Sequence, residues 1–158
     1  PGAGAGDLVR IAPSIPAALA LLACTGGPAR PAPLDTRNDA CAHCRMAVSD
    51  ARFAAQLAAP GEEPRFFDDL GCLRDWLGSQ PRLPRGAVAF VADHRTREWV
   101  RAAAASYTRN PGVQTPMSSH LLAHASAASR DADPAAAGGT PLGAAELFGP
   151  AGPPDGAP

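Results

Sequence analysis

Two thiols, an imidazole and a thioether lie within the six residues Cys41-Ala42-His43-Cys44-Arg45-Met46. The chain has one other methionine, Met117, which lies three residues before His120. Thiolate and thioether sulfurs are soft donors that select soft cations such as Cu(I). Zinc takes thiolates and imidazoles but makes little use of thioethers. The two stretches therefore predict one soft-metal site, Cu(I) by preference, formed where they meet in space.

The two methionines differ in their sequence context. Met46, taken alone, has a plainer interpretation as a core residue that fills a gap, which is the usual role of methionine. Met117 follows a proline and precedes Ser118 and Ser119. An apolar side chain has little reason to pack in such a polar segment, so Met117 is the better ligand candidate. His120 is the best nitrogen donor.

The remaining polar candidates favour structural roles. Cys72 is expected to be an inert buried thiol on a helix. His94 is expected in a solvated turn, and His124 at the surface of a strand, on the same face as His120. His43 lies inside the motif, and we expect its role to be limited to modifying the properties of the two thiols. The chain has no hydrolase triad, phosphate loop or zinc-protease motif, so we expect that it is not an enzyme.

The Cys41-x-x-Cys44 spacing also fits half of a zinc site or a redox pair. Cys-Ala-His-Cys resembles the active site of thioredoxin-like thiol oxidoreductases. That fold has a strand before the motif and a helix after it, whose N-terminus lowers the pKa of the thiol. Here the preceding segment is rich in proline, which argues against the strand. A membrane-tethered thiol-disulfide oxidoreductase is the alternative function, and Cys41 is left open between ligand, free thiol and disulfide partner of Cys44.

The N-terminal residues predict export and anchoring. Arg10 precedes an apolar run over residues 11–23, which is the form of a secretory signal. This run is shorter than the roughly 20 residues that a spanning helix needs. Cys24 follows it as in a bacterial lipobox, so we expect a signal peptide over 1–23 and lipidation of Cys24. The protein would then be anchored on the periplasmic side of a bacterial membrane, the outer membrane.

The composition limits the fold and the partners. Residues 24–37 hold the lipidated cysteine and a proline-rich tether that is not expected to pack, and residues 149–158 are expected to be a disordered tail. Aromatic residues make up only 5% of the chain, so the core must be small. The net charge is −1 with no basic run, which gives no electrostatic case for binding nucleic acid.

Residues 38–148 have the pattern of one folded domain that begins with a strand, strand, helix, strand unit. Alternation over residues 51–59, a Pro/Gly turn and residues 65–67 predict a hairpin. A helix is expected over residues 68–79, capped by Asp68, and a strand over residues 86–93.

A second, similar unit is expected to open over residues 96–107. A strand at 121–124, a weak alanine helix over 125–137 broken by Pro134, an edge strand at 138–142 and a last turn at 144–148 would follow. The predicted fold class is α+β, with two small ββαβ-type units and antiparallel or mixed sheets.

The order of these motifs resembles the NosL family, the copper-chaperone lipoproteins of nitrous-oxide reductase maturation in denitrification. The resemblance covers about residues 38–148, and the predicted lipobox also suits the family. The motifs that carry it are Cys41-x-x-Cys44-x-Met46-x-Val48, Arg52-Phe53-Ala54, Phe67-Asp68-Asp69-Leu70-Gly71-Cys72-Leu73, Glu98-Trp99-Val100 and Thr115-Pro116-Met117.

The resemblance implies an α+β fold of two ββαβ-type units and one Cu(I) held by Cys44 and Met117. Met46, Cys41 and His120 are then supporting ligand candidates. The implied partner is periplasmic apo-nitrous-oxide reductase. Family members usually carry glycine where this chain has Arg45 and Ser118, so the two loops are the places where this protein is expected to differ.

Overall fold

The computed structural model describes residues 1–2 and 27–156, so the predicted signal peptide and Cys24 lie outside the described residues. Within the described part, no helix has both the length and the apolar character that crossing a membrane requires. The first unit is a four-stranded antiparallel sheet with strand order β2-β1-β3-β4. Its elements are β1 (Ala55–Ala58), β2 (Arg65–Phe67), α1 (Leu70–Ser79), β3 (Val88–Ala92) and β4 (Trp99–Arg101).

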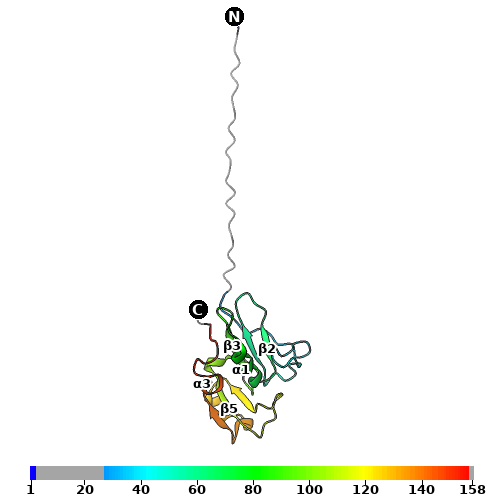
Figure 1. Cartoon of the computed structure of the whole chain (residues 1–158), viewed down its shortest axis with the longest axis vertical. Helices are drawn as coiled ribbons and strands as arrows, with labels where there is room; N and C mark the ends of the chain where they lie inside the picture. The colour runs from blue at the N-terminus through cyan, green and yellow to red at the C-terminus, as the bar shows by residue number, and fades with distance from the viewer. Residues whose placement is uncertain (3–26, 157–158) are drawn as a thin grey trace.

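The second unit is a three-stranded antiparallel sheet with strand order β6-β5-β7. Figure 1 shows α1 between the strands of the first sheet and β5 of the second, and α1 contacts strands of both. The remaining elements are the 3₁₀ turn η1 (Ala102–Ala104), β5 (Ser106–Arg109), β6 (Leu121–His124), α2 (Ala127–Asp131), the 3₁₀ turn η2 (Pro134–Ala136), β7 (Thr140–Leu142) and α3 (Ala144–Phe148).

The predicted pair of ββαβ-type units is confirmed. In each unit the first strand is central and pairs antiparallel with the second and the third, as β1 does with β2 and β3 and as β5 does with β6 and β7. The assignment of residues 96–107 to the second unit is wrong for β4, because Trp99–Arg101 pairs with β3 at the edge of the first sheet. The second unit begins only at Ser106.

Both ends of the described chain pack against the first sheet. The Gln56 side chain is fully buried in β1, and its amide bonds both the N–H and the carbonyl of Ala32, at 2.8 and 3.0 Å. The expectation that the proline-rich stretch does not pack is therefore wrong at Ala32. The predicted disorder of the tail is also wrong at Pro154 and Asp155, since Ala89 N–H donates to the Pro154 carbonyl at 2.8 Å and Asp155 bridges to Val88.

Helix α1 begins after an acidic pair, but the cap is not the predicted residue. Asp69 has extended backbone geometry, and its carboxylate accepts the N–H of Gly71 at 2.7 Å, so Asp69 and not Asp68 is the N-cap. Asp68 is buried and faces the cysteines described below. Trp76 anchors the other end of the helix on Phe67, with ring centroids 5.6 Å apart.

The two sheets are joined where β3 ends. Asp93 is fully buried, and its carboxylate accepts four hydrogen bonds, from the backbone N–H groups of Arg95, Thr96 and Ala125 and from the Ser129 hydroxyl. Burial acts to raise the pKa of Asp93, but these hydrogen bonds outweigh it and lower the pKa to about 2. Asp93 thereby ties the first sheet to the segment after β6.

The next residue, His94, extends this junction and corrects two predictions. Its backbone N–H donates to the Ala123 carbonyl at 2.9 Å, and its side chain is only 8% exposed. His124 is fully buried. The solvated position predicted for His94 and the surface position predicted for His124 are both wrong, because the junction between the sheets covers both rings.

We expect Asp93→Asn to lower the free energy of unfolding by about 2 kcal/mol at neutral pH, since one pKa unit corresponds to about 1.4 kcal/mol. Folding lowers this pKa, so the contribution is complete above the unfolded pKa of 3.8 and is lost as the pH falls through about 2. Denaturant unfolding of both proteins from neutral pH down to that range measures the difference. The exposed Asp75→Asn is the control, and a difference that did not shrink in acid would contradict the assignment.

Candidate metal centre

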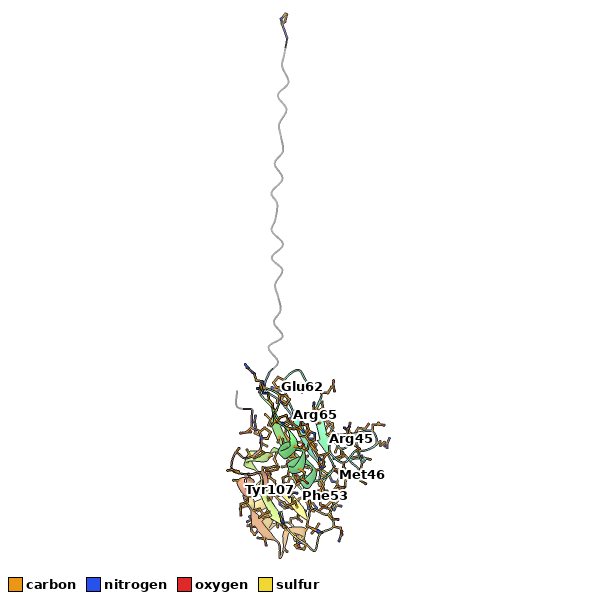
Figure 2. All side chains as sticks on the ribbon, in the orientation of Figure 1. Arg45, Met46, Phe53, Glu62, Arg65 and Tyr107 are labelled. Atoms are coloured by element: carbon orange, nitrogen blue, oxygen red, sulfur yellow. The ribbon has the colours of Figure 1, made fainter. Side chains whose placement is uncertain are left out.

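The cysteine motif forms a small hairpin on the edge of β2. Cys41 N–H donates to the Met46 carbonyl, and Ala42 N–H donates to the Phe66 carbonyl, both at 2.8 Å. An antiparallel bridge between Ala40 and Ala47 closes the hairpin. This turn buries Cys41 and leaves Met46 at the surface, and Figure 2 shows Arg45 and Met46 at one margin of the domain.

The hairpin brings Cys41 and Cys44 to two residues that the sequence did not assign to the site, Asp68 and Cys72. One ligand atom from each of these four lies within 4.8 Å of the others. The Cys44 thiol donates to the Asp68 carboxylate at 3.4 Å, and Cys44 N–H donates to the Cys41 sulfur at 3.5 Å. All three cysteines are free thiols. Cys72 is buried as predicted, but it is not isolated.

The surroundings of the thiols favour their protonated form. Burial, the Cys41 thiol and the Asp68 carboxylate raise the pKa of Cys44 to about 11, although a backbone N–H from Met46 acts in the opposite direction. Burial, followed by the hydrogen bond to Asp68, also raises the pKa of Cys72. A metal ion that binds here must displace these protons.

The second predicted segment, residues 115–120, is anchored on Asp69. The Asp69 carboxylate accepts the Thr115 hydroxyl at 2.7 Å and Met117 N–H at 3.0 Å. Gly71 lets this loop approach the helix, because a Cβ at that position would lie 2.9 Å from the Ser119 Cβ. Asp68 contacts the cysteine hairpin, and Asp69 contacts the loop over residues 115–120. Both segments are therefore fixed at the N-terminal end of α1.

The sulfur donors lie at graded depth at this end of the molecule. Cys41 and Cys72 are 0% and 3% exposed, Cys44 is intermediate, and Met117 and Met46 are 43% and 55% exposed. These two methionines are the exposed large hydrophobic side chains of the described residues. The interpretation of Met46 as a core residue is wrong. Thioethers held in water have no packing role, which favours a ligand role.

His120 is oriented as metal-binding histidines commonly are. Its Nδ1 lies 2.8 Å from the Val113 carbonyl, which can only accept, so Nδ1 carries the proton and Nε2 keeps its lone pair. Among the described side chains, however, His120 does not belong to the group of four whose ligand atoms all lie within 4.8 Å of one another. His43 is exposed.

Backbone strain is concentrated in the same two loops. The non-glycine residues with positive φ in the described chain are Arg45 (68°), Ser118 (55°) and His120 (59°) in these loops, and Arg97 (64°) elsewhere. Arg45 and Ser118 are the two positions where the resemblance described above leads us to expect glycine. The loops therefore keep a conformation that suits glycine, at a cost of about 1–2 kcal/mol per residue.

We expect Arg45→Gly and Ser118→Gly each to raise the free energy of unfolding by up to about 1 kcal/mol, because glycine adopts positive φ without the Cβ clash but loses more entropy on folding. Thermal and denaturant unfolding measure the change. Arg97→Gly is the matched control outside both loops and should give a similar gain. If both loop substitutions lowered the free energy of unfolding, the backbone strain assigned to Arg45 and Ser118 would be contradicted.

We expect Asp69→Ala to lower the free energy of unfolding by about 3 kcal/mol, because it removes the helix cap and leaves Thr115 and Met117 N–H without their acceptor. Hydrogen exchange at the Met117 and Gly71 amides should become faster. Asp75→Ala, on the exposed side of the same helix, is the control. Unchanged exchange at Met117 would show that Asp69 does not hold this loop.

Comparison with known proteins is consistent with this geometry. A model of the NosL family matches residues 31–148, which is most of the chain and includes both loops and α1. No curated protein and no solved structure matches the chain. The match indicates a copper-related function, to which a group of cysteines able to hold a metal ion is well suited. The chain belongs to the NosL family, a family of copper-binding proteins.

Proposed function

We propose that this protein binds one Cu(I) at Cys44 and delivers it for assembly of the copper centre of nitrous-oxide reductase. The observation that carries the proposal is the set of sulfur donors at graded depth at one end of α1, from buried thiols to exposed thioethers. Soft sulfur ligands select Cu(I) over harder ions. Family membership supports the copper-chaperone role.

The arrangement suits capture followed by hand-over. Cys44 is the half-buried donor between the inner thiols and the surface, and it supplies a thiolate once its proton is displaced. Met46 and Met117 supply weaker, neutral donors at the surface. A partner's ligand can attack the ion from that side, so that each new bond forms before an old one breaks. Cu(I) then passes to apo-nitrous-oxide reductase without release into water.

The location and the partner rest on family membership and on the sequence. A lipid anchor on Cys24 would hold the domain on the periplasmic side of the outer membrane. The chain already packs against the domain at Ala29 and Ala32. The anchor would thus keep the domain near the membrane where exported apo-reductase is met.

The thiol-disulfide oxidoreductase is less well supported. Active-site thiols of that class have a lowered pKa at a helix N-terminus, whereas the pKa of Cys44 is raised to about 11, chiefly by burial. The residues around Cys44 form a turn and a bridge, and the next helix begins only at Leu70. The site therefore favours metal binding over rapid disulfide exchange.

A competitive Cu(I) titration under anaerobic, reducing conditions tests the site. We expect one Cu(I) per chain, with an affinity at least about 100-fold lower in Cys44→Ser and about tenfold lower in Met117→Leu, since these changes remove a thiolate and a thioether ligand. Acid should weaken binding because protons compete for the thiolate. His43→Gln, an exposed change within the motif, is the control. An unchanged affinity in Cys44→Ser would refute the assignment.

Transfer is tested separately. Cu(I)-loaded protein is mixed with apo-nitrous-oxide reductase, and copper in each protein is measured after they are separated. Transfer that persists when a Cu(I) chelator is present supports direct hand-over. Tight binding without transfer would indicate storage. Preference for Zn²⁺ over Cu(I) would assign the thiol group with Asp68 to a zinc site instead.

A further inference from the structure

A second group of metal-ligating side chains lies at the junction between the two sheets. One carboxylate oxygen, Asp133 Oδ2, lies 2.6 Å from His94 Nδ1 and 2.9 Å from His124 Nε2. One ligand atom from each of the three lies within 4.8 Å of the others. None of the copper-ligand candidates belongs to this group.

The three side chains come from separate elements that hold them in place. His94 follows β3, and its ring packs at a tilt against that of Phe53, with ring centroids 5.1 Å apart. His124 ends β6. Asp133 lies between α2 and η2, and its other carboxylate oxygen accepts Ala135 N–H at 2.9 Å. The side chains are at most 8% exposed. The group is thus built into the fold before any ion binds.

The hydrogen bonds of this group do not account for its residue types. Each ring uses one nitrogen toward Asp133, while His94 Nε2 and His124 Nδ1 are buried without a partner in the described structure. A purely structural clamp needs one donor per side chain, which an amide would supply. The second ring nitrogens cost about 1–3 kcal/mol each when left unpaired. An imidazole nitrogen, unlike an amide nitrogen, can also coordinate a metal ion.

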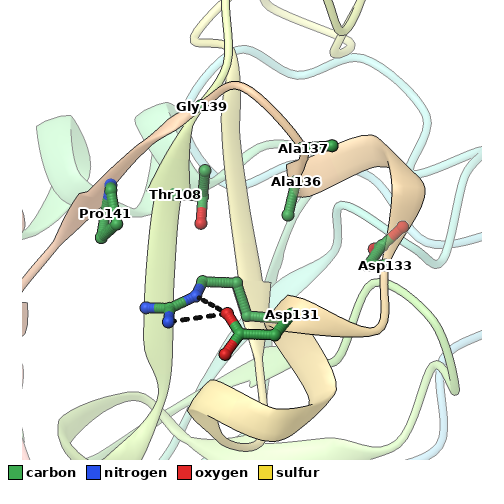
Figure 3. A pocket seen from close by; sticks show the side chains of 8 residues that line it. Thr108, Asp131, Asp133, Ala136, Ala137, Gly139 and Pro141 are labelled. Atoms are coloured by element: carbon green, nitrogen blue, oxygen red, sulfur yellow. Dashed lines mark hydrogen bonds and ion pairs between the residues drawn. The ribbon is translucent and has the colours of Figure 1, made fainter.

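Asp133 also lines a small cavity of about 270 Å³. Figure 3 shows Thr108, Asp133 and the ion pair of Arg130 with Asp131 around it. The Thr108 hydroxyl is buried and also has no partner in the described structure. Unpaired polar atoms thus occur both in the group and on the wall of the adjoining cavity.

We propose that His94, His124 and Asp133 form a second metal site, for a divalent first-row transition ion such as Zn²⁺ or Cu²⁺. Two imidazole nitrogens and a carboxylate oxygen suit such borderline ions. The absence of sulfur makes the site a poor one for Cu(I). On binding, each ring proton moves from the nitrogen that faces Asp133 to the other ring nitrogen. Two N–H···O bonds are replaced by three coordinate bonds, and no proton is released.

Zinc titration of the purified full chain with nitrogen-labelled histidine tests this site. We expect Zn²⁺ to shift the ring nitrogen resonances of His94 and His124 to values typical of coordination. Because Zn²⁺ also suits the thiol group, stoichiometry is compared in Cys44→Ser, which should keep the ion at the histidines.

Asp133→Asn should weaken the binding that the histidine resonances report by at least about tenfold, since a charged ligand is lost. Asp131→Asn is the matched control, because Asp131 borders the same cavity but pairs with Arg130. Unchanged His94 and His124 resonances in excess Zn²⁺ would overturn the proposal and leave a hydrogen-bonded clamp. That result is read on the unaltered chain, so it does not depend on the folding of any variant.

Discussion

The carboxylate of Asp69 fixes the start of α1 and one of the two loops at the candidate metal-binding end of this protein. It caps α1 through Gly71 and fixes the second loop through Thr115 and Met117. The preceding residue, Asp68, points into the thiol group. Two adjacent residues therefore hold the hairpin that carries the thiols and the loop that carries Met117 against the same end of α1. Because the helix start is rigid and buried, both loops take their positions from it rather than from each other.

The same end of the molecule combines strain, exposure and protonated thiols. Arg45, Ser118 and His120 have positive φ, which holds the loops in shapes that most residues avoid. Met46 and Met117 stay in water, while the raised pKa of Cys44 keeps its thiol protonated until a metal ion displaces the proton. The proposed hand-over of a soft ion relies on these properties.

The junction between the sheets is held by hydrogen bonds between buried polar groups. Asp93 and His94 are consecutive residues with different partners. The Asp93 carboxylate accepts hydrogen bonds chiefly from backbone N–H groups, whereas the His94 ring and His124 both contact Asp133. Asp93 and His94 are both buried, so their polar contacts strongly affect stability. The two units meet where β3 approaches β6, and also where α1 contacts β6 and α3. The nitrogen and oxygen donors of this junction and the sulfur donors beside α1 occupy separate places in one small fold.

Several features could be predicted from residues close together in the chain: the Cys41–Met46 motif, the helix over most of residues 68–79, the hairpin before it and the break at Pro134. The order of the motifs also pointed to the family. The other features depend on contacts between distant segments. The tertiary structure selected Asp69 over Asp68 as cap, brought Cys72 to Cys41 and Cys44, assigned Trp99–Arg101 to the first sheet and buried His94 and His124. Periodicity and capping depend on neighbours within a few residues, whereas burial and metal-ligand geometry depend on segments that only folding brings into contact.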